Sequence, residues 1–145
     1  MKKLFKLGVI GCGFMAHAIL KGVVLSDFLR AKKVVVSDTS EEALDKAADL
    51  GIQCTTNNKF LVENSEYVLI AVKPQSFAAV AESLEGAVPE KVISIMAGVK
   101  RDKIKAAIGR SALVARCMPN LPCSIGSGVI GVDMTDFNSS QQDIE

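Results

Sequence analysis

The sequence predicts an α/β domain of the doubly wound type, a mostly parallel sheet with helices on both faces. Short apolar runs alternate with helical patterns along the chain, and this rhythm is typical of βαβ units. Several runs are apolar at consecutive positions, such as residues 34–36 and 67–72, as expected of strands that are buried on both faces. A glycine-rich turn stands where the first apolar run meets the first helical pattern.

The glycine-rich turn, Gly11-x-Gly13-x-x-Ala16, follows an apolar run at residues 4–10 that we interpret as the first strand. Dinucleotide sites need this order of elements. Gly11 permits the tight turn, Gly13 lets backbone amides approach a pyrophosphate, and Ala16 lets the helix pack on the strand. The pyrophosphate then sits at the positive N-terminal end of the helix. We therefore expect a dinucleotide to bind at this turn.

Two helices carry specific expectations. In the helix after the glycine turn, Met15, Ile19 and Val23 recur at i, i+4 and i+8, and this spacing predicts the apolar face of the helix. The helix after the second strand begins at T-S-E-E, where Thr39 and Glu42 predict a capping box. Apolar spacing also predicts helices at residues 77–84 and around 104–108, and a short helical segment opens at residues 57–58. Further strands are expected at residues 33–38, 52–55, 67–72, 92–96 and 112–116, with one more short strand within 126–134.

Composition bounds the class of protein. With 145 residues, 49% of them hydrophobic and 23% charged, the chain fits one globular domain with a substantial core. The net charge of +1 provides no field for nucleic acid or an anionic membrane, and no apolar run approaches the roughly 18 residues that span a bilayer. Four cysteines without close paired spacing and a single histidine do not suggest a metal site. We expect reduced thiols in the cytoplasm, no metal, and neither nucleic acid nor a membrane as a partner.

Asp38 closes the second strand, 22 residues after Ala16 (38 − 16). In the dinucleotide fold an acid at this place accepts a hydrogen bond from a ribose 2′-hydroxyl. The same carboxylate would repel a 2′-phosphate, which carries roughly two negative charges. The alternative is that Asp38 only stabilises the N-terminus of the next helix through the helix dipole.

Other turns allow two interpretations. Lys73-Pro74 and Ala97-Gly98 follow strands at the end of the sheet where doubly wound proteins bind ligands, but each also fits a plain turn. In R-C-M-P-N-L-P, residues 116–122, two prolines fix a turn that either holds the Asn120 amide toward a ligand or is only structural.

Taken together, these segments resemble pyrroline-5-carboxylate reductase. The resemblance covers essentially the whole chain, through G-x-G-x-M-A at residues 11–16, A-V-K-P at 71–74, S-I-M-A-G-V at 94–99 and R-C-M-P-N-x-P at 116–122. The last motif is the most specific of the four, because other dinucleotide domains lack it. The resemblance implies an NAD(P)H-dependent reduction of the small molecule 1-pyrroline-5-carboxylate to L-proline.

The resemblance also implies roles for single residues. Residues 11–16 cradle the pyrophosphate, Ser37 and its neighbours meet the adenosine ribose, and Asn58 lies near the adenine. The nicotinamide half is lined by Val72, Lys73 and Ala97. The cofactor is NADH or NADPH, and we favour NADH because of Asp38. The complete set of expected cofactor-binding residues is Gly11, Cys12, Gly13, Phe14, Met15, Ala16, Ser37, Asp38, Asn58, Ala71, Val72, Lys73, Pro74, Ala97, Gly98 and Asn120.

The expected organisation is one NAD(P)-binding domain of the Rossmann type over residues 1–145. The family's C-terminal helical domain, which supplies the substrate pocket and forms homo-oligomers, is expected to be absent. Catalytic residues would lie there, so we expect cofactor binding without useful turnover. Two alternatives are a non-catalytic dinucleotide-binding module and another short NAD(P)-dependent reductase, although the segment at residues 118–120 argues against the latter.

Overall fold

The computed structural model describes residues 2–119 and 130–137, and the following elements lie within these ranges. The strands are β1 (Phe5–Ile10), β2 (Val34–Ser37), β3 (Gln53–Thr55), β4 (Ser65–Ile70), β5 (Lys91–Ser94), β6 (Leu113–Met118) and β7 (Gly131–Asp133). The helices are α1 (Phe14–Leu25), α2 (Glu41–Ala48), α3 (Asn58–Asn64), α4 (Phe77–Ser83) and α5 (Arg101–Ile108), with 3₁₀ turns η1 (Ala31–Lys33), η2 (Pro74–Ser76) and η4 (Thr135–Phe137).

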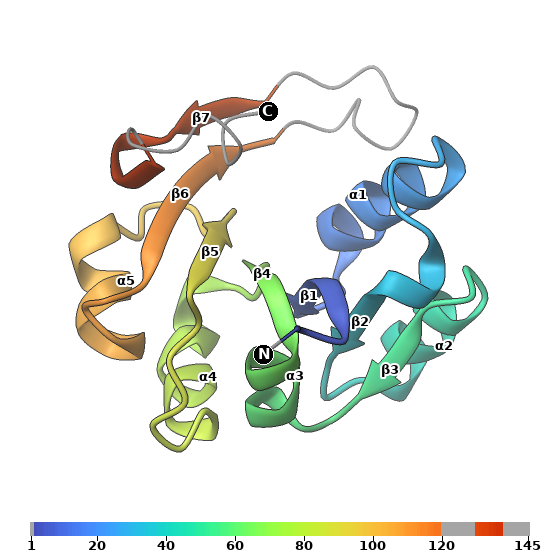
Figure 1. Ribbon diagram of the computed structural model, residues 1–145, viewed down its shortest axis with the longest axis horizontal. Coiled ribbons are helices and arrows are strands. Elements are labelled where there is room, and N and C mark those ends of the chain that lie inside the picture. Colours follow the sequence, from blue (N-terminus) through green and yellow to red (C-terminus); the bar gives the residue numbers. More distant parts are fainter. Residues whose placement is uncertain (1, 120–129, 138–145) are drawn as a thin grey trace.

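The strands form one sheet in the order β3-β2-β1-β4-β5-β6-β7 (Figure 1). Strands β1 to β6 run parallel, and β7 pairs antiparallel with β6. The predicted fold, a doubly wound and mostly parallel sheet, is therefore confirmed. The chain order reverses at β1, whose neighbours are β2 and β4, and in such sheets this switch point opens a crevice at the carboxyl ends of the strands.

The core has two parts, one on each face of the sheet. On one face, α3, α4 and α5 cover β4, β5 and β6 with side chains such as Leu61, Val80 and Ile104. On the other face, α1 and α2 cover β1 and β2, where Leu20 and Ala47 are buried. In the part of the chain that the structure describes, no helix is both long enough and apolar enough to cross a membrane.

The predicted apolar face of α1 is wrong in part. Ala16 and Leu20 are buried, whereas Met15, Ile19 and Val23 are only half-buried. Both sets repeat at i and i+4, so spacing alone does not choose between them. The small Ala16 side chain lies against the core of β1 and β2, and this contact sets the rotation of the helix.

The predicted capping box of α2 is also wrong. The N-cap is Ser40, whose hydroxyl accepts a hydrogen bond from the Ala43 amide at 3.3 Å. Glu42 extends outward, and its carboxylate lies 3.0 Å from the ammonium of Lys46, four residues along the helix. Ser40 is as good a cap as Thr39, and it stands where the chain turns into the helix.

A carboxylate fastens the last described segment to the rest of the sheet. Asp136, in η4, accepts hydrogen bonds from the backbone amide of Val114 at 3.0 Å and from the ammonium of Lys105 at 3.1 Å. Phe137 beside it is buried. Burial alone would raise the pKa of Asp136, but these two hydrogen bonds and the nearby charges of Lys105 and Arg101 hold that pKa below its ordinary value. The element that follows β7 is thus tied to both α5 and β6.

Candidate functional site

The glycine turn lies at the switch point of the sheet, and Gly11 makes it possible. Gly11 has a φ of +91°, and a Cβ at this position would lie 2.8 Å from Cγ1 of Val72 and 3.0 Å from the carbonyl carbon of Ala71. The Gly11 amide donates to the Ser37 carbonyl at 2.8 Å, and the Ala71 amide donates to the Ile10 carbonyl at 2.9 Å. These bonds join the carboxyl ends of β1, β2 and β4 around a turn that only glycine fits.

Gly13 differs from Gly11. It is the N-cap of α1, with an ordinary extended backbone at φ −74°. A Cβ at Gly13 would meet no heavy atom of the described chain within 4 Å. The packing of the protein therefore does not demand glycine here, and the space in front of the backbone is open.

The first turn of α1 is left uncapped. Among the described residues, no side chain accepts a hydrogen bond at its N-cap, and its first turn contains no acidic residue. By contrast, α2 begins with the Ser40 cap and two acidic residues, Glu41 and Glu42. Since α1 has 12 residues, its N-terminus carries the partial positive charge of a full helix dipole. This arrangement suits an anion that approaches from outside the chain.

Asp38 is fixed by two backbone amides. Its Oδ2 accepts a hydrogen bond from the Cys12 amide at 2.6 Å, and its Oδ1 accepts one from the Ser40 amide at 2.8 Å. Asp38 thus joins the glycine turn to the start of α2, and each carboxylate oxygen keeps a further lone pair. The distance in sequence between Asp38 and Cys12 is 26 residues, so no local pattern indicates this bond.

The two residues expected on the adenosine side contact each other. Ser37 is buried at the end of β2, and its hydroxyl donates to Oδ1 of Asn58. The Asn58 amide nitrogen donates in turn to the Ser83 hydroxyl at 2.8 Å. This chain of hydrogen bonds connects β2, α3 and α4 at the same end of the sheet. Sequence reasoning missed the contribution of Ser83, because it comes from a distant helix and belongs to no motif.

The remaining expected residues follow the ends of β4 and β5. Val72 is half-buried, and Lys73 and Pro74 are exposed at the start of η2. Ala97 and Gly98 are exposed as well. Because parallel strands end at the same edge of a sheet, these segments lie along the edge that holds the glycine turn. Asn120 lies outside the described residues.

Cys12, inside the glycine turn, is buried at 4% exposure. Burial and, next, the charge of Asp38 raise the pKa of its thiol to about 11, so the thiol is protonated near neutral pH. This environment fits a packing role rather than nucleophilic chemistry. Phe14, by contrast, is 71% exposed at the first position of α1. Among the described residues, no group of three His, Cys, Asp or Glu side chains is arranged to hold a metal ion.

Comparisons with known proteins agree with this geometry. A model of the family described as NADP oxidoreductase coenzyme F420-dependent matches residues 6–98. The chain is 33% identical over 127 residues to a pyrroline-5-carboxylate reductase of Aquifex aeolicus, a match that covers 88% of this chain and 47% of that protein. It is 32% identical over 130 residues to the Methanosarcina acetivorans enzyme of the same name. That match covers 88% of this chain and 48% of that protein.

Solved structures show the same similarity. A pyrroline-5-carboxylate reductase from Coxiella burnetii matches 98% of this chain with a TM-score of 0.84 and 28% identity, and 54% of that chain is covered. The Plasmodium falciparum pyrroline carboxylate reductase with NADP bound matches 99% of this chain and 53% of its own, with a TM-score of 0.79. At 21% identity this second likeness shows the fold alone. The chain spans about half the length of the curated relatives that it matches.

Proposed function

The chain belongs to the family described as NADP oxidoreductase coenzyme F420-dependent, and on that premise we propose that it is the dinucleotide-binding half of a pyrroline-5-carboxylate reductase. The reaction reduces a cyclic imine with a carboxylate substituent to the corresponding secondary amine, L-proline. When bound, the dihydronicotinamide supplies a hydride to the imine carbon, which is more electrophilic once the imine nitrogen is protonated. The residues of this chain bind and orient the cofactor for that step.

One observation carries the proposal: the open start of α1 at the switch point of the sheet. The Gly13 position is unobstructed, and the first turn lacks an acidic residue and, among the described residues, a side-chain cap. The pyrophosphate of a dinucleotide fits this place because its charge is matched by the amides and the dipole of the helix. Residues 11–16 would hold the pyrophosphate.

The other residues divide between the two halves of the cofactor. Asp38 and Ser37 would meet the adenosine ribose, and Asn58, which is hydrogen-bonded to Ser37, would lie near the adenine. The segments 71–74 and 97–98 would line the nicotinamide half. Lys73 lies along this edge, at the start of η2. We favour NADH because the fixed Asp38 carboxylate accepts from a 2′-hydroxyl and repels a 2′-phosphate.

The binding step has a direct test. Gly13→Val places a branched side chain where the pyrophosphate would lie, and we expect calorimetry to show loss of NADH and NADPH binding. Gly22→Val is the matched control, because a Cβ at Gly22, on the same helix, also meets no described heavy atom within 4 Å. Equal affinity in wild type and Gly13→Val would remove this site assignment. Circular dichroism and urea unfolding check that both variants fold.

The open start of α1 also fits a second candidate, a dinucleotide-binding module without catalysis. The 145 residues alone are expected to form L-proline far more slowly than an ordinary enzyme rate of roughly 10 per second, under either proposal. The two differ when the rest of a relative's polypeptide is joined to the chain. A half-reductase gains activity with 1-pyrroline-5-carboxylate, whereas a separate module binds cofactor and stays inactive. We place the protein in the cytoplasm, where free thiols such as Cys54 and Cys117 stay reduced.

A further inference from the structure

We propose that Ser83 is a positioning residue for the adenosine side of the cofactor site. It fixes the direction of a chain of hydrogen bonds that runs through Asn58 to Ser37. In this direction Ser37 has lone pairs for the cofactor but no proton to donate. The role rests on the proposed function, because it concerns how the same site distinguishes NADH from NADPH.

The direction is set at the end of α4, where Ser83 is the last residue. Its hydroxyl lies 2.6 Å from the carbonyl oxygen of Val80. A carbonyl oxygen only accepts, so the Ser83 hydroxyl donates its single proton there. The oxygen of Ser83 is left with lone pairs, and it accepts a hydrogen bond from the amide nitrogen of Asn58 at 2.8 Å.

Asn58 passes this direction on to β2. Because its Nδ2 faces Ser83, its Oδ1 faces Ser37, and this oxygen also only accepts. The Ser37 hydroxyl therefore donates its proton to Asn58, and water has little access to that hydroxyl because Ser37 is 3% exposed. The reversed Asn58 amide is disfavoured, since its Oδ1 would meet an oxygen whose proton is already held by Val80.

The two side chains proposed to meet the ribose then both offer acceptors only. Ser37 keeps lone pairs alone, and Asp38 is a carboxylate whose two oxygens already accept from backbone amides. A ribose 2′-hydroxyl can donate to such oxygens. A 2′-phosphate, which carries roughly two negative charges near neutral pH, finds no donor in either side chain. Ser83 thus favours NADH from a helix that belongs to no dinucleotide motif.

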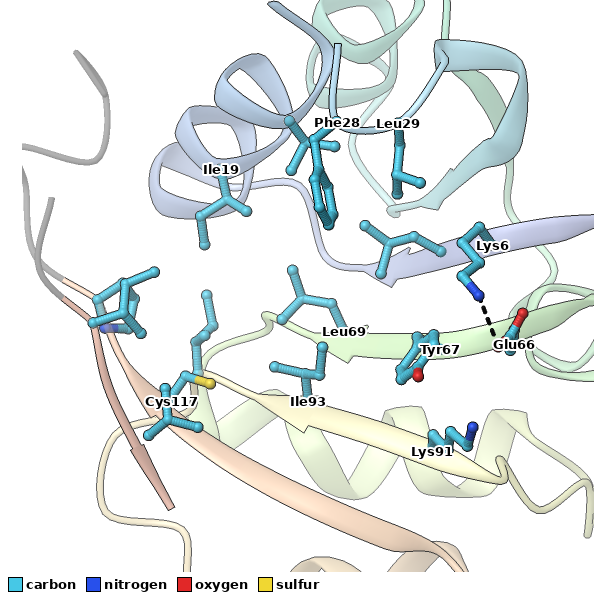
Figure 2. Close-up of a pocket in the computed structure, with 16 residues that line it drawn as sticks. Lys6, Ile19, Phe28, Leu29, Glu66, Tyr67, Leu69, Lys91, Ile93 and Cys117 are labelled. Carbon is cyan, nitrogen blue, oxygen red and sulfur yellow. Dashed lines mark hydrogen bonds and ion pairs between the residues drawn. The ribbon is translucent and has the colours of Figure 1, made fainter. Parts of the chain in front are cut away.

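A matched serine lies on the other face of the sheet. Ser26 directly follows α1, and its hydroxyl donates at 3.3 Å to the carbonyl of Val23, three residues earlier, in the same pattern as Ser83. On this face Ile19 and Phe28 line a cavity of about 530 Å³ (Figure 2). The residues of the hydrogen-bond chain do not line that cavity. Ser26→Ala therefore removes a comparable hydroxyl and leaves the chain intact.

The experiment measures the dissociation constants of NADH and NADPH by calorimetry at one ionic strength. In Ser83→Ala a water takes the place of the hydroxyl, and because water both donates and accepts, the Asn58 amide can reverse and free the Ser37 proton. We expect the NADPH constant divided by the NADH constant to fall by about threefold or more, as for one hydrogen bond gained. Ser83→Thr keeps the hydroxyl and should restore the wild-type ratio, and Ser26→Ala should leave the ratio unchanged.

The ratio separates this role from simple support of α4. If Ser83 only stabilised the helix, Ser83→Ala would weaken NADH and NADPH equally, and an unchanged ratio would overturn the proposal. Because Ser83 acts through Ser37, Ser83→Ala should no longer change the ratio in a Ser37→Ala background. An effect of the same size in that background would contradict the proposal as well. A wild-type chain that bound neither dinucleotide would instead remove the proposed function, and this role with it.

Discussion

Helices α1 and α2 begin at the same end of the sheet, yet their first turns are built in opposite ways. The start of α2 is complete in itself, with the Ser40 cap and the acidic residues Glu41 and Glu42. The start of α1 has Gly13 at the cap position and no acid in its first turn. Glycine at the cap position costs a helix about a few tenths of a kcal/mol relative to serine, so the start of α1 loses little stability while its amides stay open. Because no described side chain caps the first turn of α1, the amides of that turn are available to a ligand.

The largest effect is expected when α1 is made to resemble α2. Gly13→Asp adds a capping carboxylate at the place where the pyrophosphate would bind. Stability should stay the same or rise by roughly a few tenths of a kcal/mol, since aspartate caps slightly better than glycine. Dinucleotide affinity should fall by about 100-fold or more through repulsion and lost space. Urea unfolding and calorimetry on one sample measure both quantities, and a variant that still binds NADH tightly would contradict our comparison.

The next effect separates the two glycines of the turn. Gly11→Ala introduces a Cβ at positive φ, 3.0 Å from the backbone of Ala71 and Val72 directly after β4, so the fold should lose about 2 kcal/mol of stability. Gly13→Ala, at an ordinary backbone conformation, is the control and should change stability little. Thermal or urea unfolding checks the difference. If both variants unfolded alike, the close approach at Gly11 would not be the reason for glycine there.

A smaller effect is expected at Asp38, which links the two helix starts. Asp38→Asn removes the negative charge near the ribose, so NADH should bind more weakly and NADPH more tightly. The ratio of the two dissociation constants should fall by on the order of tenfold. The decisive numbers are the two dissociation constants at one ionic strength, because salt screens phosphate binding. Tighter binding of NADPH than of NADH by the wild type would show that Asp38 serves the glycine turn alone.

The smallest of these effects concerns α2. Ser40→Ala removes the hydroxyl that accepts from Ala43, and we expect a loss of about 1 kcal/mol in unfolding free energy. Cofactor affinity should not change, because Ser40 caps α2, and the first turn of α2 is stabilised without a ligand. A parallel loss of NADH affinity would mean that the two helix starts are coupled through Asp38.

Much of the fold could be predicted from local patterns. The apolar runs that became β1, β2 and β5 and the glycine turn depend on neighbours in the sequence, so their positions were predicted to within a few residues. The buried face of α1 could not be predicted, because Ala16 and Leu20 share the period of Met15 and Ile19, and only the sheet distinguishes the two faces.

The internal bonds of the candidate site were equally out of reach. The bond from Cys12 to Asp38 joins two loops, and the chain from Ser37 through Asn58 to Ser83 joins a strand and two helices. Motifs indicate which residue types stand at an edge of the sheet. They do not indicate which of those side chains bond to each other, because that depends on how distant elements pack.

Asp136 holds the segment of β7 and η4 against β6 and α5, and this contact is sensitive to acid. Its folded-state pKa lies below the ordinary value of about 4, so its stabilisation is complete above that value and is lost as pH falls through the folded pKa. Below that pH the segment of β7 and η4 should loosen, and hydrogen exchange of the β6 amides should rise. A bared β6 would present unpaired N–H and C=O groups to other molecules. Acidified samples should therefore aggregate by strand-to-strand pairing at this edge, before the rest of the sheet unfolds, and Asp136→Asn should do so already near neutral pH.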